Sequence, residues 1–253
     1  MSKTLVIAHR GDNQFAPENS LSAFASAISK GADAIEFDVH LTRDHQLVIH
    51  HDYYLGRTEN GSGFVGDYSL TELQAFDIGS WFGDEFRGEK MPTLSDVLNM
   101  GKGKVLFEIE LRCPTLSFLK KVLADVDHFG ITNDVEITSP HIPLLHHAKN
   151  INNGLRRGVF FNSYPEWKDT SLGQQHIIDW MILIDAQVVH LPYSLLEREF
   201  VERLHAENFI VHVSNLGNEK EMKSAISKGI NQFSTDKLGL ALAVRDTMKS
   251  NET

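Results

Sequence analysis

Residues 104–112 read Lys-Val-Leu-Phe-Glu-Ile-Glu-Leu-Arg, and residues 34–39 read Ala-Ile-Glu-Phe-Asp-Val. Apolar residues alternate with carboxylates in both stretches, which is the two-residue period of a β-strand, whose successive side chains face opposite sides. One face of each strand is apolar and suited to being covered by helices. The other face carries the acidic side chains, which would point into the interior if these strands belong to a barrel.

Outward from these two stretches, short β-branched runs alternate with longer helical patterns. The runs that predict barrel strands are Leu5–His9, Ala34–Val39, Lys104–Arg112, Asp134–Thr138, Gly158–Phe161, Gln187–Leu191, Phe209–Ser214 and Asn231–Thr235. The stretches that predict helices are Ser20–Lys30, Thr93–Met100, Pro114–Phe129, His141–Asn150, Ser171–Ile184, Ser194–Glu207, Glu219–Lys228 and Gly239–Lys249. Eight strands alternating with eight helices over 253 residues predict an α/β fold, the TIM (β/α)8 barrel. A doubly wound open sheet also alternates, but no Gly-x-Gly-x-x-Gly directly follows any of these strands, which disfavours its dinucleotide-binding form.

One region interrupts the alternation after the second strand. A further short strand is predicted at Leu47–His51, and glycines and aromatic residues follow it, including Phe64, Trp81, Phe82 and Phe86. A loop of this length is uncommon unless it is functional or folded in its own right. We therefore expect one domain over residues 1–253, with a small inserted subdomain at about 52–92.

Composition narrows the class of protein. Hydrophobic residues make up 42% of the chain, and 24 Lys and Arg stand against 34 Asp and Glu, for a net charge of −10. This acidic balance argues against nucleic acid or an anionic membrane as a partner, because both need clustered basic residues. The single cysteine, Cys113, cannot form an internal disulfide. No apolar stretch approaches the roughly 18 residues needed to span a bilayer, so we expect a cytoplasmic protein without stable membrane insertion, and the oligomeric state stays open.

Strand periodicity gathers polar residues at one end of the predicted barrel. Glu36 and Asp38 share the inner face of one strand, and Glu110 lies on the inner face of another. The same rule turns His9 inward and places His51 on the face opposite to its neighbour His50. Buried carboxylates at this density repel one another unless a cation compensates them. An oxygen-rich ligand set suits Mg²⁺ or Ca²⁺ rather than Zn²⁺.

Short motifs in order and at matching spacing resemble the signature blocks of the glycerophosphodiester phosphodiesterase family. They are His9-Arg10-Gly11, Pro17-Glu18-Asn19-Ser20, Glu36-Phe37-Asp38-Val39, Thr42-Arg43-Asp44, Val48-Ile49-His50-His51-Asp52, Arg57-Thr58 with Gly61 and Gly63, Met91-Pro92-Thr93-Leu94 and Thr235-Asp236. The resemblance implies a TIM barrel with a subdomain inserted after the second strand. It also implies metal-dependent hydrolysis of glycerophosphodiesters, small-molecule substrates, to glycerol 3-phosphate and an alcohol. The attacking group, water or the substrate's own glycerol hydroxyl, is left open.

The resemblance also implies roles for individual residues. Glu36, Asp38 and Glu110 correspond to metal ligands, His9 and His51 to the catalytic acid and base, and Arg10 to a phosphate ligand.

Among the departures from the family pattern, two concern expected site residues. Arg112 stands where the family usually has Lys, and we expect it to contact phosphate; the alternative is that it pairs with Glu108 and steadies the strand. His212 lies in a block where the family often has Trp, on an inward face with Ser214, and we expect it to touch substrate. The other histidines are expected at the surface or at helix caps: His40, His45, His50, His128, His141, His146, His147, His176, His190 and His205.

Two other functions remain as alternatives. A lysophospholipase-D-like lipid phosphodiesterase would need an apolar opening for an acyl chain, which the aromatic residues of the insertion can supply unless they form its own small core. A non-catalytic barrel that only binds its ligand is disfavoured, because both histidines and all three carboxylates are present.

Overall fold

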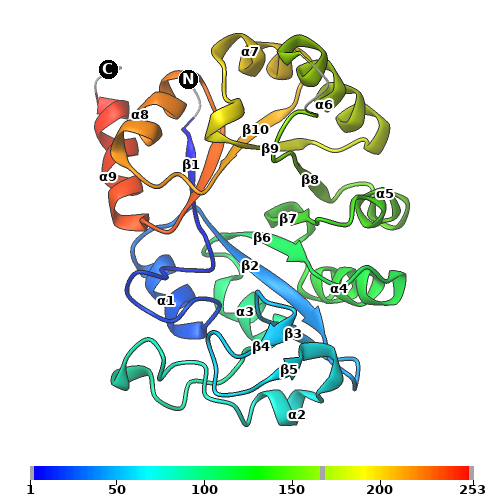
Figure 1. Cartoon of the computed structure of the whole chain (residues 1–253), viewed down its shortest axis with the longest axis vertical. Helices are drawn as coiled ribbons and strands as arrows, with labels where there is room; N and C mark the ends of the chain where they lie inside the picture. Colours follow the sequence, from blue (N-terminus) through cyan, green and yellow to red (C-terminus); the bar gives the residue numbers. More distant parts are fainter. Residues whose placement is uncertain (1–2, 166–168, 251–253) are drawn as a thin grey trace.

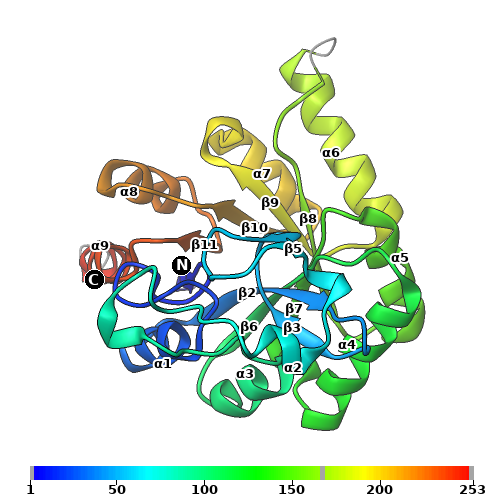
Figure 2. The ribbon, with the colours of Figure 1, turned by 60° about the horizontal axis from the view of Figure 1, so that its bottom comes forward.

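Eight parallel strands form a closed barrel in the computed structural model, which describes residues 3–165 and 169–250. They are β1 (Leu5–Ala8), β2 (Ala34–Leu41), β6 (Leu106–Leu111), β7 (Val135–Thr138), β8 (Arg156–Phe160), β9 (Val188–Pro192), β10 (Ile210–Ser214) and β11 (Gln232–Thr235). Strand β1 pairs with both β2 and β11, which closes the sheet. The predicted TIM barrel is confirmed, and each predicted strand is present with boundaries shifted by at most two residues (Figures 1 and 2).

Helices surround the strands (Figure 2). They are α1 (Leu21–Ser29), α3 (Leu94–Gly101), α4 (Leu116–Phe129), α5 (Ile142–Ile151), α6 (Thr170–Ile184), α7 (Arg198–Ala206), α8 (Glu219–Ser227) and α9 (Leu238–Ser250). Short 3-10 turns lie at Val65–Asp67, Asp84–Phe86, Thr132–Asp134 and Tyr193–Leu195. The prediction placed the start of α7 at Ser194, which is wrong by four residues, because a 3-10 turn precedes an extended Leu196 and the helix begins only after Glu197.

The main hydrophobic core lies between the barrel and its helices. Phe37 and Phe107 project outward from β2 and β6, and Phe24 of α1 meets Phe37 with ring centroids 5.6 Å apart. Phe37 and Phe107 are themselves 6.2 Å apart in an edge-to-face arrangement, the geometry that aromatic pairs prefer. Because these apolar faces point outward, the acidic side chains on the opposite faces of β2 and β6 point into the barrel.

A second, smaller hydrophobic cluster joins β3 (Leu47–Ile49) to the stretch where the inserted subdomain is predicted. Strand β3 pairs antiparallel with β2, a short hairpin joins β4 (Tyr54–Leu55) to β5 (Gly63–Phe64), and α2 covers Leu70–Leu73 (Figure 1). The cluster consists of Val48, Leu55, Val65, Leu73, Ile78 and Met91. The domain boundaries given for this insertion stay a prediction.

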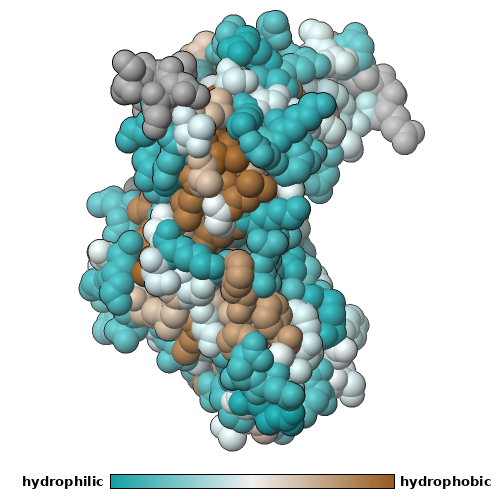
Figure 3. Space-filling view, turned by 90° about the vertical axis from the view of Figure 1, so that its left-hand side faces the viewer, coloured by the Kyte–Doolittle hydropathy of each residue, from teal (hydrophilic) through white to brown (hydrophobic). Residues whose placement is uncertain are grey.

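Hydrophilic side chains cover much of the outer face seen in Figure 3, and apolar residues gather in smaller areas of it. Among the described residues, no helix combines the length and the apolar character needed to cross a bilayer.

The turn after β1 depends on Gly11. Gly11 has a φ of +83° and directly follows Arg10, whose φ of 55° is also left-handed. A Cβ atom at position 11 would lie 2.7 Å from the Cβ of Ala23 in α1, closer than van der Waals contact allows. The glycine therefore meets two demands at once, a left-handed backbone and close packing of the turn against α1.

Replacement of Gly11 by alanine should lower the free energy of unfolding for two reasons, the left-handed backbone and the clash with Ala23. Gly31 is a matched control, because it has the same φ of +83° but a Cβ atom there would meet no other atom within 4 Å. We expect Gly31→Ala to cost about 1–2 kcal/mol through the left-handed backbone. Gly11→Ala should cost about 1–3 kcal/mol more through the clash with Ala23. Urea denaturation of both variants measures the difference, and equal costs would contradict the packing role of Gly11.

Candidate active site

A cavity of about 420 Å³ opens at the carboxyl ends of the barrel strands. Its charged lining includes His9, Arg10, Glu36, Glu110 and Arg112. Active sites of TIM barrels lie at this end of the barrel, where side chains from several strand ends meet. The sequence prediction placed these five residues at the same mouth.

Glu36, Asp38 and Glu110 form a carboxylate cluster below this opening. The strand register aligns Asp38 of β2 with Glu110 of β6, and one oxygen from each of the three residues lies within 4.8 Å of the others. Asp38 is 1% exposed and Glu36 is 4% exposed. Asn19 donates a hydrogen bond to Asp38 Oδ2 at 3.0 Å, whereas Asp38 Oδ1 has no hydrogen-bond partner within the described part of the chain.

The carboxylate cluster carries more negative charge than its surroundings offset. Burial and then the charge of Asp38 raise the pKa of Glu36 to about 8, and the same two causes raise the pKa of Glu110. A divalent cation would relieve this repulsion, and an all-oxygen donor set fits a hard cation such as Mg²⁺ or Ca²⁺. The cluster can therefore hold a divalent metal ion.

His9 follows β1 and lies beside the carboxylate cluster. Its Nδ1 lies 2.7 Å from Asp236 Oδ1, and its Nε2 lies 3.9 Å from Glu36 Oε2. Burial lowers the pKa of His9, but the hydrogen bond to Asp236 and the charge of Glu36 outweigh it, so this pKa is raised overall. Asn13 donates to both Asp236 Oδ1 and the carbonyl of His9, which holds the pair in place.

Arg112 and His51 meet on the other side of the cluster. Arg112 donates to the carbonyl of His51 at 2.9 Å, and its Nη2 lies 3.1 Å from His51 Nε2. The acidic partners of Arg112 are Glu110 and, at 3.5 Å, Asp38, so its pairing is not the one with Glu108 that the sequence left as an alternative. The pKa of His51 is lowered, chiefly by burial.

The route by which His51 reaches the mouth differs from the predicted one. Ile49 pairs with Val39, whose side chain packs in the outer core, so the face of Leu47 and Ile49 is the outer one. Strict alternation would then turn His51 away from the cavity. Strand β3 instead ends at Ile49, and a bend at His51 brings its ring to Arg112.

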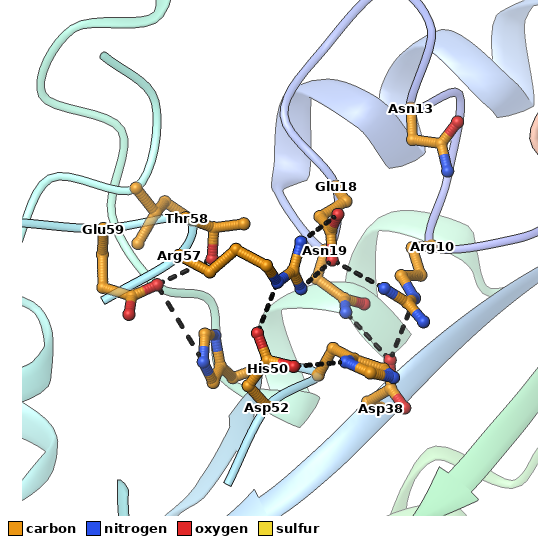
Figure 4. Close-up of polar contacts among 12 residues, drawn as sticks. Arg10, Asn13, Glu18, Asn19, Asp38, His50, Asp52, Arg57, Thr58 and Glu59 are labelled. Carbon is orange, nitrogen blue, oxygen red and sulfur yellow. Dashed lines mark hydrogen bonds and ion pairs between the residues drawn. The ribbon is translucent and has the colours of Figure 1, made fainter. Parts of the chain in front are cut away.

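A chain of ion pairs links the two sides of the site (Figure 4). Glu18 accepts from Arg10 at 2.9 Å and from Arg57 at 2.7 and 2.8 Å. Arg57 also binds Asp52, and Asp52 Oδ1 lies 2.8 Å from His51 Nδ1. The sequence motifs contained Glu18, Asp52 and Arg57 but gave no sign of their roles, because loop conformations bring them together.

Four of the histidines are buried. His212 is fully buried within the barrel, and the part of β10 that lines the described cavity is Ser214, two residues closer to the mouth. This position does not support the expected contact with substrate. His40, His50 and His190 were expected at the surface or at caps, which is wrong, because all three are at most 4% exposed. His40 and His50 lie near each other, with ring centroids 6.2 Å apart, and His190 contacts Glu136 inside the barrel.

His190 and His212 belong to a second polar group inside the barrel, here called the inner group. Its members are Glu108, Glu136, His190 and His212. One ligand atom from each lies within 4.8 Å of the others, so this group too can hold a divalent metal ion. The sequence singled out Glu108 and His212 but did not connect them with Glu136 or His190.

The chain is similar in sequence to a known protein family and to individual proteins of that family. Residues 9–240 match the Glycerophosphoryl diester phosphodiesterase family. The chain is 32% identical over 238 residues to the glycerophosphodiester phosphodiesterase of Caldanaerobacter subterraneus subsp. tengcongensis, a match that covers 92% of this chain and 94% of that protein.

Two solved structures have the same fold over almost their whole length. The glycerophosphodiester phosphodiesterase from Agrobacterium tumefaciens superposes with a TM-score of 0.82 at 28% identity, covering 95% of this chain and 99% of that one. An Oleispira antarctica phosphodiesterase, solved with the product sn-glycerol-3-phosphate, superposes with a TM-score of 0.82 at 25% identity, covering 96% of this chain and 97% of that one. The matches support glycerophosphodiester phosphodiesterase activity, and the chain belongs to the glycerophosphoryl diester phosphodiesterase family.

Proposed function

We propose that this chain uses a divalent cation to hydrolyse glycerophosphodiesters to glycerol 3-phosphate and an alcohol. One observation carries the proposal: Glu36, Glu110, His9 and two arginines line a single cavity, Asp38 lies beside the two glutamates, and His51 contacts Arg112. These are the groups that hydrolysis of a phosphodiester requires, namely cation ligands, proton-transfer groups and positive charge for the phosphate.

The carboxylate cluster is the proposed cation site, with Mg²⁺ or Ca²⁺ as its ion. Asp38 Oδ1 accepts no hydrogen bond from the described residues and has only the Arg112 guanidinium near it at 3.5 Å, so it can serve as a ligand, while Asn19 holds the other oxygen of Asp38. When bound, the cation supplies positive charge that polarises the phosphate and offsets charge developing in the transition state.

Arg10 and Arg112 are the proposed phosphate ligands. Arg10 is held by Glu18, and Arg112 by Glu110 and by the carbonyl of His51, so both guanidinium groups are oriented before substrate arrives. A planar guanidinium can bind two phosphate oxygens at once, which makes it suited to fix the orientation of the phosphate.

The hydrogen bonds of the two histidines suggest opposite roles. His51 directs Nδ1 to Asp52, and Arg112 approaches Nε2 as a donor, which favours a neutral ring with a lone pair on Nε2. We assign His51 as the base that takes the proton from the attacking hydroxyl. His9 is flanked by Asp236 and Glu36, which favour the charged ring, and we assign it as the acid that protonates the leaving alcohol.

The cavity lining favours a small polar substrate. Hydroxyl and amide side chains of Ser139, Asn162, Ser214, Asn215 and Ser234 face the space next to the charged groups. The aromatic residues of the insertion considered for an acyl chain, Phe64, Trp81, Phe82 and Phe86, are not among the described residues that line it. A glycerophosphodiester therefore fits the cavity better than a lysophospholipid, and nucleic acid is not expected as a partner of this acidic chain.

An assay of several glycerophosphodiesters beside a lysophospholipid, each with and without a chelator, tests the function. We expect release of glycerol 3-phosphate from the glycerophosphodiesters, loss of activity on chelation, and recovery when Mg²⁺ or Ca²⁺ is added back. Turnover of the lysophospholipid alone, or turnover unaffected by chelation, would contradict the proposal.

Substitution of the two histidines tests their roles in proton transfer. His9→Ala and His51→Ala should each lower kcat by about 10²-fold or more, because each removes a proton-transfer group. His50→Gln is the matched control: His50 is adjacent in sequence to His51 but lies 3.9 Å from Glu59, away from the cavity. It should turn over at close to the wild-type rate, and an inactive His50→Gln beside an active His51→Ala would overturn the assignment.

The pH dependence of kcat/KM follows from the two shifted pKa values. A base works in its neutral form, and the pKa of His51 is lowered, so activity should rise at a pH below the ordinary histidine value of 6.5. An acid works in its protonated form, and the pKa of His9 is raised, so activity should fall only above 6.5. Asp236→Asn removes the hydrogen-bonded charge that raises the pKa of His9, so the alkaline limb should move to lower pH. A pH profile in which only the acidic limb moves would show that the two roles are reversed.

A further inference from the structure

The inner group lies deeper in the barrel than the carboxylate cluster. Its residues come from β6, β7, β9 and β10, and their side chains are 0–4% exposed. Glu108 precedes Glu110 by two residues on the same face of β6, and His212 precedes the cavity residue Ser214 by two residues on β10. The inner group therefore lies at its own level of the barrel, below the five charged residues of the cavity. Of its members, Glu108 also lines the cavity.

Contacts within the inner group leave ligand atoms unused. His190 Nε2 lies 2.6 Å from Glu136 Oε1, and His212 Nδ1 lies 3.4 Å from Glu108 Oε2. The two imidazole rings are stacked with centroids 4.0 Å apart. Glu108 Oε2, His190 Nδ1 and His212 Nε2 have no hydrogen-bond partner in the described part of the chain. Buried polar atoms are rarely left unpaired, because each costs roughly 1–3 kcal/mol.

Gly158 of β8 makes room for the group. Strand β8 lies between β7 and β9, and a Cβ at position 158 would lie 2.5 Å from both Glu136 Oε1 and His190 Nε2. Only a residue without a side chain lets Glu136 and His190 meet across this strand. Glycine weakens the interior of a strand, so its place here is best explained by this close approach.

We propose that the inner group binds one divalent transition-metal ion, with Zn²⁺ as the representative ion, separately from the cation of the carboxylate cluster. Two imidazole nitrogens and two carboxylates give four ligands, the usual number for Zn²⁺, and two carboxylate charges balance a divalent ion. Gln232, which is not itself a proposed ligand, donates to Glu136 Oε2 at 3.0 Å and so orients this ligand. The ion joins four of the eight barrel strands beneath the active site.

Glu108 belongs to the inner group and also lines the active-site cavity, so this residue connects the two sites. The two sites differ in chemistry. The carboxylate cluster offers oxygen only and takes a hard ion, whereas the inner group offers nitrogen and oxygen and takes a softer one. Excess Mg²⁺ should therefore fill the cluster without displacing Zn²⁺ from the inner group.

The test is a Zn²⁺ titration of metal-free protein in excess Mg²⁺, with bound zinc measured by elemental analysis. Wild-type protein and a Glu36→Gln, Glu110→Gln double variant should each retain one equivalent of zinc. His212→Gln, and Gly158→Ala, which changes no ligand, should bind zinc about 10-fold or more weakly. Zinc lost from the double variant but kept by His212→Gln would overturn the proposal, as would no tight zinc in wild-type protein.

A spectroscopic measurement can be made on wild-type protein alone, so it does not depend on whether a variant folds. Co²⁺ in a four-coordinate site with nitrogen ligands absorbs visible light intensely, and Co²⁺ in a six-coordinate oxygen site absorbs weakly. Added to metal-free protein in excess Mg²⁺, one equivalent of Co²⁺ should give the intense bands. A weak spectrum would contradict the inner site while leaving the proposed phosphodiesterase activity, tested by its own Mg²⁺ or Ca²⁺ requirement, unaffected.

Discussion

Repulsion among carboxylates held inside the barrel is the constraint on which the site depends. Glu36 and Asp38 are two residues apart on β2, and the register brings Glu108 and Glu110 of β6 directly beside them. These charges are buried, so water does little to screen them. The raised pKa values of Glu36, Glu108 and Glu110 are the direct result, with burial as the largest cause in each case. Arg10 and Arg112, which both lie within 4 Å of Asp38, offset part of this charge.

Few positively charged groups offset the charge of these carboxylates within the site. The left-handed turn at Arg10 offsets this charge with both its backbone and its side chain. The backbone N–H of Arg10 donates to Glu36 Oε2 at 2.9 Å, while its guanidinium reaches Glu18 and lies 3.7 Å from Asp38. Gly11 then packs the turn against α1. One tight turn thus supplies a backbone donor, a cation and, through His9, an imidazole to the same cavity.

Much of the fold was predictable from sequence, because strands and helices with one apolar face show their period locally. The inward placement of Glu36, Asp38 and Glu110 was predictable for the same reason. Alternation along one strand does not reveal depth within the barrel, and so it could not separate Ser214 at the cavity from His212 below it. Nor could it show that Gly158 leaves room for Glu136 to reach His190, or that Asp236 supports His9, since these contacts join strands and loops distant in sequence.

The central claim is that the carboxylate cluster exists to hold a cation that meets the phosphate. A crystal structure of the protein with Ca²⁺ and glycerol 3-phosphate tests it most directly. Oxygens of Glu36, Asp38 and Glu110 should all lie at roughly 2.3–2.6 Å from one ion, the usual range for Ca²⁺, with a phosphate oxygen completing its shell. Glycerol 3-phosphate bound in the cavity with the three carboxylates more than about 6 Å apart, too far for any common ion, would contradict the claim.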